Sequence, residues 1–189
     1  MRKIGVYGGT FDPIHHGHLI LARDAREQLD LDKVIFVPAA RSPHKMNKLQ
    51  SSAEARLRMV LAATEGDPAF DVSNFEVRRP PPSFTIDTAE HIAARENDAE
   101  LIYLLGEDHL NDLATWHRFA DLKRLVSFGV LSRSGNDHAH AFPRIERKIE
   151  ISSSDIRERV ASGLPIRYLV PKAVEAIIRE EQLYMEIRK

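Results

Sequence analysis

The chain of 189 residues is long enough for one domain with a sizeable core, and 27 lysines and arginines balance 28 aspartates and glutamates. That balance excludes the strongly basic character of proteins that bind nucleic acids or membrane surfaces. The absence of cysteine excludes disulfides, a thiol nucleophile and thiolate metal sites. The first apolar stretch, residues 4–7, is too short for a signal peptide, and no run could span a bilayer, so we expect a cytoplasmic protein.

Apolar runs of strand length alternate with helical patterns along most of the chain. The runs predict strands at residues 4–7, 34–37, 70–77, 101–105 and 126–131. Apolar residues at helical spacing predict helices at 19–29, 52–65 and 85–95, and short helices within 108–125. Buried strands that alternate with helices are typical of α/β proteins in which helices cover both faces of an open parallel sheet.

The C-terminal part of the chain has a different character. From Ser153 onward we find helical patterns and no strand signal, and Pro171 opens the last predicted helix. We therefore expect a single domain over residues 1–189, with an α/β core at 1–151 and a small helical portion at 152–189.

The stretch GGTFDPIHHGHL, residues 8–19, follows the first predicted strand. Ligands of open parallel sheets bind beyond the carboxyl ends of the strands, where helix N-termini present free N–H groups. Gly8 and Gly9 would let a phosphate approach the backbone, and His15 and His18 could face one point from the start of the helix. The stretch fits neither a dinucleotide fingerprint nor a Walker loop, and a turn with two solvated histidines is the alternative interpretation.

A second cluster, ISSSDIRERV, occupies residues 151–160. Ser152 or Ser153 can cap the helix that follows, and Ser152 with Asp155 fits a capping box. Capping leaves Arg157 unexplained, whereas hydroxyls, free N–H groups and an arginine at one helix start form an anion site. Two anion sites with histidines and no candidate nucleophile indicate phosphoryl or nucleotidyl transfer by positioning and charge stabilisation.

Together the two motifs resemble the signatures of the nucleotidylyltransferases, H-x-G-H in His15–His18 and S-[ST]-[ST]-x-x-R in Ser152–Arg157. Within that superfamily the chain is similar to the bacterial nicotinate-nucleotide adenylyltransferases along nearly all its length. The similar blocks are SPHK (42–45), PSFTIDTAEHI (82–92), LLGEDHLNDLATWHRF (104–119) and RYLVPKAVEAII (167–178). The resemblance implies a Rossmann-like nucleotidylyltransferase fold. It also implies a reaction of ATP with nicotinate mononucleotide that gives nicotinate adenine dinucleotide and pyrophosphate, in NAD biosynthesis.

The resemblance further implies roles for residues of both motifs. His15, His18 and Arg157 would act on the ATP phosphates as the catalytic residues. The other residues expected to bind ATP are Gly8, Gly9, Thr10, Phe11, Ile151, Ser152, Ser153 and Ser154. The phosphate of the mononucleotide is already an anionic nucleophile, so no general base is required. We expect Mg²⁺ to arrive with ATP, held by phosphate oxygens and water, and no metal site made by the protein alone.

The residues expected to bind the mononucleotide are Lys45, Ser83, Thr85, Gly106, Asp108, Trp116 and Arg133. Trp116 would stack on the nicotinate ring, and the helix start at Thr85 would donate N–H groups to the substrate carboxylate. Such donors favour the acid over the amide, so a strong preference for nicotinate mononucleotide is predicted. Three of these assignments have a structural alternative: a solvated loop for Lys45, an N-cap for Asp108 and a core position for Trp116. Arg133 precedes Ser134-Gly135, where the family commonly has Pro-Gly.

Other functions fit the sequence less well. Phosphopantetheine adenylyltransferases usually carry T-x-G-H in the first motif and lack the block around Trp116, and a nicotinamide mononucleotide adenylyltransferase is a second relative. A nucleotide sensor would not need both His15/His18 and Arg157, and a tRNA synthetase fragment would need a different lysine-rich loop. A zinc site at His15, His16 and His18 lacks further ligands of suitable geometry. The sequence leaves the oligomeric state open, and we expect His91, His117, His138 and His140 at the surface.

Overall fold

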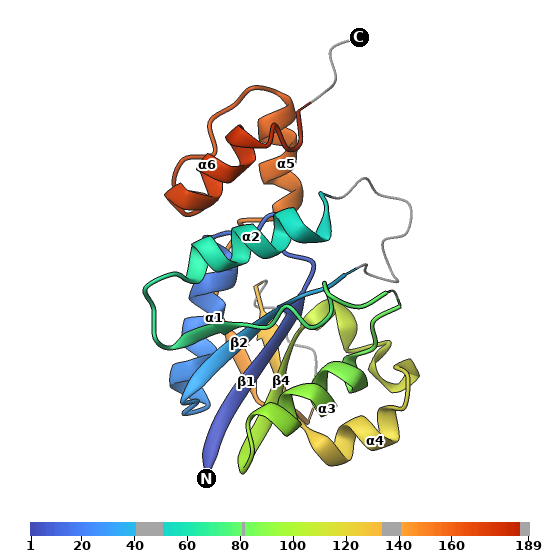
Figure 1. The fold of residues 1–189 in the computed structure, drawn as a ribbon. Helices are drawn as coiled ribbons and strands as arrows, with labels where there is room; N and C mark the ends of the chain where they lie inside the picture. The colour runs from blue at the N-terminus through green and yellow to red at the C-terminus, as the bar shows by residue number, and fades with distance from the viewer. Residues whose placement is uncertain (41–50, 81, 134–140, 186–189) are drawn as a thin grey trace.

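The computed structural model describes residues 1–40, 51–80, 82–133 and 141–185, which form a six-stranded parallel sheet and its covering helices (Figure 1). The strands are β1 (Arg2–Gly9), β2 (Lys33–Pro38), β3 (Phe70–Val72), β4 (Ala99–Gly106), β5 (Ser127–Ser132) and β6 (Arg144–Glu146). Their order in the sheet is β3-β2-β1-β4-β5-β6, and every neighbouring pair is parallel. This arrangement confirms the predicted open α/β fold.

The helices divide between the two faces of the sheet. They are α1 (His16–Gln28), α2 (Ala53–Thr64), α3 (Thr85–Arg95), α4 (Phe119–Leu125), α5 (Ser153–Ala161) and α6 (Lys172–Glu180). Buried side chains of α1, α2, α5 and α6 share one core cluster, and those of α3 and α4 share the other. Figure 1 shows α5 and α6 stacked beyond α2, over the end of the sheet where the strands finish.

Alternation along β1 explains why both faces must be covered. Ile4 and Val6 are buried in the cluster with α3, whereas Tyr7 is buried in the cluster with α1. Successive side chains of a strand point to opposite faces, so a strand that is apolar at every position requires a layer on each side. This observation accounts for the unbroken apolar character of the central strands.

Three details differ from the sequence-based expectations. α1 begins at His16, one turn before the apolar pattern that starts at Leu19, because the polar histidines occupy its first turn. β3 ends at Val72 and does not reach residue 77, since the chain turns away after Ser73 donates its N–H to the Phe36 carbonyl at 2.9 Å. β6 was not predicted.

The proposed division of the domain at residue 151 stays a prediction. The described part of the chain contains no helix with the length and apolar character to cross a bilayer.

Candidate active site

The first motif begins where β1 ends, between β2 and β4, at the point where the strand order reverses. In open sheets this is the usual ligand-binding edge. A Cβ atom at Gly8 would overlap the Tyr103 hydroxyl, and one at Gly9 would lie 2.8 Å from the Phe11 ring. Both glycines therefore make room for neighbouring aromatic side chains. This packing explains why glycine occupies both positions. The approach of a phosphate to their backbone stays a prediction.

The loop that follows β1 is held in an unusual backbone conformation. Phe11 has a φ of 49°, in the left-handed region that a phenylalanine seldom adopts. Its buried ring contacts Tyr7, Phe36 and His18, with centroid separations of 5.3, 5.7 and 5.1 Å. Phe11, expected to bind ATP, is thus a core residue that shapes the loop. Thr10, in the same loop, offers its carbonyl to the buried Arg56.

The two motif histidines lie together at the start of α1. His15 is the N-cap residue, and its ring stacks on His18 with centroids 3.7 Å apart. The His15 backbone N–H donates to Nδ1 of His18 at 3.3 Å. The predicted meeting of the two imidazoles is confirmed. Gly17 permits it, because a Cβ there would lie 3.0 Å from the His15 ring.

The electrostatics of His15 are those of a neutral, desolvated group. Burial, together with the positive charge of Arg133 and the neighbouring His16, lowers the pKa of His15 to about 3. No hydrogen-bond partner for either ring nitrogen occurs among the described residues. A buried polar group without a partner is costly, so the two ring nitrogens call for an explanation.

The second motif caps α5 and reaches the first. Ser152 accepts the Asp155 N–H at 3.1 Å, which confirms the predicted cap. Ser153 Oγ donates to the Pro13 carbonyl at 2.9 Å. Arg157 donates to the Asp12 carbonyl at 2.7 Å and to Ser154 Oγ at 3.2 Å. The structure therefore brings the two motifs together, through residues that lie 140 and 145 positions apart in the chain.

Arg133 joins the same edge from the end of β5. Its Nη1 donates to the Ile151 carbonyl at 3.4 Å, immediately before the serines of the second motif. Its charge also contributes to the lowered pKa of His15. Lys45, Ser134 and Gly135 lie outside the described residues, as do His138 and His140.

The residues predicted to bind the mononucleotide lie around the start of α3 and the end of β4. Thr85 is the first residue of α3 and is half-buried, and burial raises the pKa of the Tyr103 hydroxyl in β4. Trp116 is half-buried and meets Tyr103 edge-on, with centroids 5.9 Å apart. Trp116 therefore packs on one side and is accessible on the other.

The remaining predicted positions fall in the same region. Asp108 is exposed, and Gly106 is the N-cap of the short helix at 107–109, so the N-cap alternative for Asp108 is wrong. Ser83 is half-buried two residues before α3. Two histidines expected at the surface are exposed: His91 stacks on Phe75 with centroids 4.0 Å apart, and the ring of His117 is tilted against that of Phe84 at 4.3 Å.

Sequence reasoning missed a polar cluster beneath the first motif, made by the buried Asp12 and Arg56 and the half-buried Ser51 and Tyr184. Arg56 is 1% exposed and donates to the carbonyls of Ala39, Thr10, Ala40 and Ser51 at 2.6, 2.9, 2.9 and 3.3 Å. Burial lowers its pKa. The signal for Arg56 was available, since it shares the apolar face of α2 with Met59 and Val60. No sequence pattern marks Tyr184.

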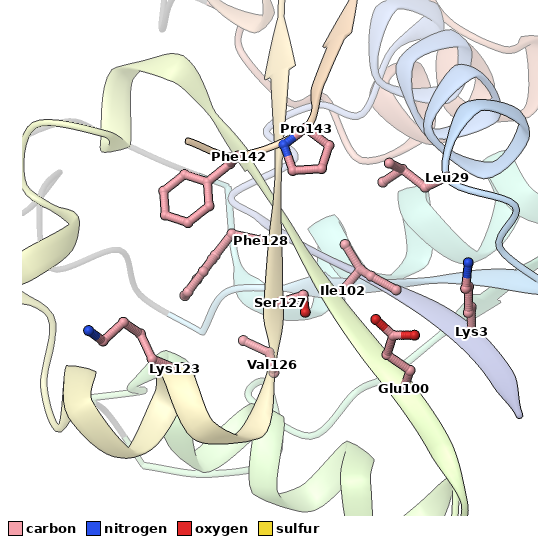
Figure 2. Close-up of a pocket in the computed structure, with 10 residues that line it drawn as sticks. All are labelled: Lys3, Leu29, Glu100, Ile102, Lys123, Val126, Ser127, Phe128, Phe142 and Pro143. Carbon is pink, nitrogen blue, oxygen red and sulfur yellow. The ribbon is translucent and has the colours of Figure 1, made fainter. Parts of the chain in front are cut away.

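A cavity of about 480 Å³ lies elsewhere, at the amino ends of β4 and β5 (Figure 2). Phe128, Phe142 and Ile102 form its apolar wall, with Lys3 and Lys123 among its polar residues. None of its lining residues is a predicted site residue. Ligands of parallel sheets bind at the opposite ends of the strands, so we do not place the active site in this cavity.

Comparison with known proteins agrees with the geometry. The cytidylyltransferase-like family model matches residues 6–159. A probable nicotinate-nucleotide adenylyltransferase of Thermomicrobium roseum is 42% identical over 200 residues, covering 99% of this chain and 94% of that protein. One of Exiguobacterium sibiricum is 43% identical over 189 residues, covering 96% and 98%. The fold resembles Plasmodium falciparum nicotinic acid mononucleotide adenylyltransferase complexed with NaAD, with a TM-score of 0.77, 18% identity and coverage of 97% and 98%.

Proposed function

Since the chain belongs to the cytidylyltransferase-like family, and within it to the nicotinate-nucleotide adenylyltransferases, we propose that it joins nicotinate mononucleotide to the adenylyl group of ATP. The products are nicotinate adenine dinucleotide and pyrophosphate, and the reaction is a step of NAD biosynthesis. The observation that carries the proposal is the union of the two motifs, through Ser153 with Pro13 and Arg157 with Asp12.

The chemistry required is positioning and charge stabilisation. A phosphate oxygen of the mononucleotide attacks the α-phosphorus of ATP, and the bond from that phosphorus to the pyrophosphate oxygen breaks. Negative charge builds on the pyrophosphate, where the Arg157 guanidinium and the imidazoles of His15 and His18 would donate hydrogen bonds. With its lowered pKa His15 is neutral at pH 7 and still carries one N–H to donate. Thr10 and the start of α5, including Ile151 and the serines, would complete the ATP site.

Enzymes of this kind use ATP and generally a divalent metal ion. In the described ranges, no group of three or more acidic or histidine side chains could hold a metal. The Asp12 carboxylate already accepts hydrogen bonds from Tyr184 and Ser51. These residues do not make a metal cage, so we propose that Mg²⁺ enters on the phosphates of ATP and completes its shell with water.

The mononucleotide would lie between the start of α3 and the accessible side of Trp116. Ser83 and Thr85 would receive the carboxylate of the substrate, Trp116 would stack on the pyridine ring, and Gly106 and Asp108 would contact the ribose. Lys45 and Arg133 would bind the phosphate. N–H donors of a helix start suit a carboxylate and oppose the NH₂ of a carboxamide, and such sites discriminate by roughly 10⁴–10⁵. We therefore expect kcat/KM for the acid to exceed that for the amide by about 10⁴.

The test is pyrophosphate release from Mg²⁺-ATP with nicotinate mononucleotide, nicotinamide mononucleotide, phosphopantetheine or no acceptor. Release should require the acid mononucleotide, and the dinucleotide should form in equal amount. The same assay is run on Arg157→Ala, which removes the guanidinium proposed to act on the phosphates. Arg167→Ala is its matched control, because Arg167 packs over Tyr168 at the surface. Release that needs no acceptor, or only phosphopantetheine, would disprove the proposed substrate.

A further inference from the structure

We propose that Tyr184 is a positioning residue for adenylyl transfer, which acts through Asp12 on the loop at residues 10–13 and so on Arg157. The inference rests on the proposed function and adds a residue that the resemblance did not indicate. Tyr184 follows α6 in the C-terminal segment, 172 positions from Asp12. Its hydroxyl nevertheless lies within the polar cluster under the first motif.

The contact is a charge-assisted hydrogen bond in a buried place. The Tyr184 hydroxyl donates to Oδ1 of Asp12 at 2.6 Å, and Asp12 is only 3% exposed. Ser51 donates to the same oxygen through its hydroxyl and, at 3.4 Å, through its backbone N–H. Burial and the charge of Asp12 both raise the pKa of the Tyr184 hydroxyl, so it remains a protonated donor at any working pH. Hydrogen bonds from neutral donors to carboxylates are short and stronger than neutral pairs.

This bond completes a set of fixed points around the loop. Arg56 holds the carbonyl of Thr10, and Arg157 and Ser153 hold the carbonyls of Asp12 and Pro13. The Asp12 side chain is a further fixed point of the loop, and Tyr184 supplies one of its donors. All of these hydrogen bonds therefore hold the loop at residues 10–13.

The loop needs anchoring because its backbone is strained. Phe11, with a φ of 49°, lies between Thr10 and Asp12. A left-handed conformation at a residue of this kind costs energy and persists only when the surrounding contacts determine it. Loss of the Tyr184 hydroxyl leaves Ser51 as the donor to Asp12 and lets the loop relax. Any shift of the Asp12 carbonyl then moves the Arg157 guanidinium that is bonded to it.

A purely structural clamp on the C-terminal segment would have different consequences. It would lower the thermal unfolding midpoint when removed and leave turnover by the folded protein unchanged. A positioning role instead lowers kcat, because Arg157 acts where charge develops. KM for nicotinate mononucleotide should stay the same, because its proposed pocket lies at α3 and Trp116.

The experiment compares Tyr184→Phe with Tyr168→Phe, a control that removes a hydroxyl from a side chain in the same segment that is 78% exposed. Both full-length variants are assayed for pyrophosphate release well below their unfolding midpoints, with and without Arg157→Ala. We expect Tyr184→Phe to lower kcat about tenfold, with an unchanged KM for the mononucleotide, and Tyr168→Phe to change neither. On the Arg157→Ala background the effect of Tyr184→Phe on kcat should fall below about twofold, because residues that act as a unit are not additive.

The outcomes separate the two proposals. An active wild type with unchanged kcat in Tyr184→Phe overturns the positioning role and leaves the proposed function intact. Equal effects of Tyr184→Phe with and without Arg157 also overturn it, since the hydroxyl would then act independently. A wild type that forms no dinucleotide overturns the proposed function and the positioning role together. If Tyr184→Phe does not fold, Ser51→Ala removes another donor to the same Asp12 oxygen and is held to the same criteria.

Discussion

The buried histidine of the first motif should make stability depend on pH in a definite direction. The pKa of His15 is about 3 in the folded protein and 6.5 in an unfolded chain. Between those values the unfolded state binds a proton that the folded state does not. Stability is therefore fully present above pH 6.5 and is lost as the pH falls, with a slope that approaches about 1.4 kcal/mol per pH unit. Between pH 6 and pH 5 this linkage amounts to about 1 kcal/mol for this one group.

The assay is urea unfolding at pH 6 and pH 5 for the wild type and for His15→Phe, which keeps an aromatic ring and cannot titrate. Other titrating groups affect both proteins and cancel in the comparison. We expect the wild type to lose about 1 kcal/mol more than the variant on this step. Ile14→Val is the control, because Ile14 is a fully buried neighbour of His15 that does not titrate. It should lower the free energy of unfolding by about 1 kcal/mol at both pH values and leave the dependence on pH unchanged. Equal losses in the wild type and in His15→Phe would show that the folded imidazole protonates as readily as the free one, and the desolvation argument would be refuted.

Three further predictions follow from the geometry of the site. His18→Ala should lower kcat by roughly 10²–10³ and Arg157→Ala by about 10³ or more, measured as pyrophosphate release, and near-normal turnover would remove that residue from the proposed mechanism. Gly8→Ala should destabilise by about 1–3 kcal/mol in urea unfolding because its methyl group meets the Tyr103 hydroxyl. Tyr103→Phe should relieve part of that cost, and a double variant no more stable than Gly8→Ala would contradict the clash. Arg56→Met should cost about 3 kcal/mol or more since it strips several buried carbonyls of their donor, and unaltered unfolding would show that water replaces the guanidinium.

The parallel core could be predicted because the central positions of its long strands are almost all apolar. β1, β2, β4 and β5 each form an unbroken buried run, and a run of that kind needs no knowledge of the rest of the chain. β6 could not be found this way, because only Ile145 of its three residues is buried. A strand this short forms because it pairs with the edge of β5. That edge exists only once the rest of the sheet has formed.

The candidate site also has a part that the sequence indicates and a part that only the structure reveals. His15, His18 and Arg157 stand at spacings that indicate their chemistry, and the structure brings these residues to one edge. The interpretation of Gly8 needed the position of Tyr103, which lies far away in the chain. The polar cluster at Asp12 draws Ser51 and Tyr184 from segments that share no local pattern, so its members become visible only in three dimensions. Local sequence indicates residue chemistry, whereas the partners that hold those residues depend on the completed fold.

The bonds between α5 and the loop after β1 set an order of events during protein synthesis. The ribosome delivers the loop first and α5 only after all six strands have been translated. A nascent chain that already contains the whole sheet still has no Ser153 for the Pro13 carbonyl and no Arg157 for the Asp12 carbonyl. Such a chain has the loop after β1 without the two α5 side chains that hold its carbonyls. Premature termination after β6 therefore yields a product with one of the two motifs, and the proposed ATP site is complete only when α5 has been made.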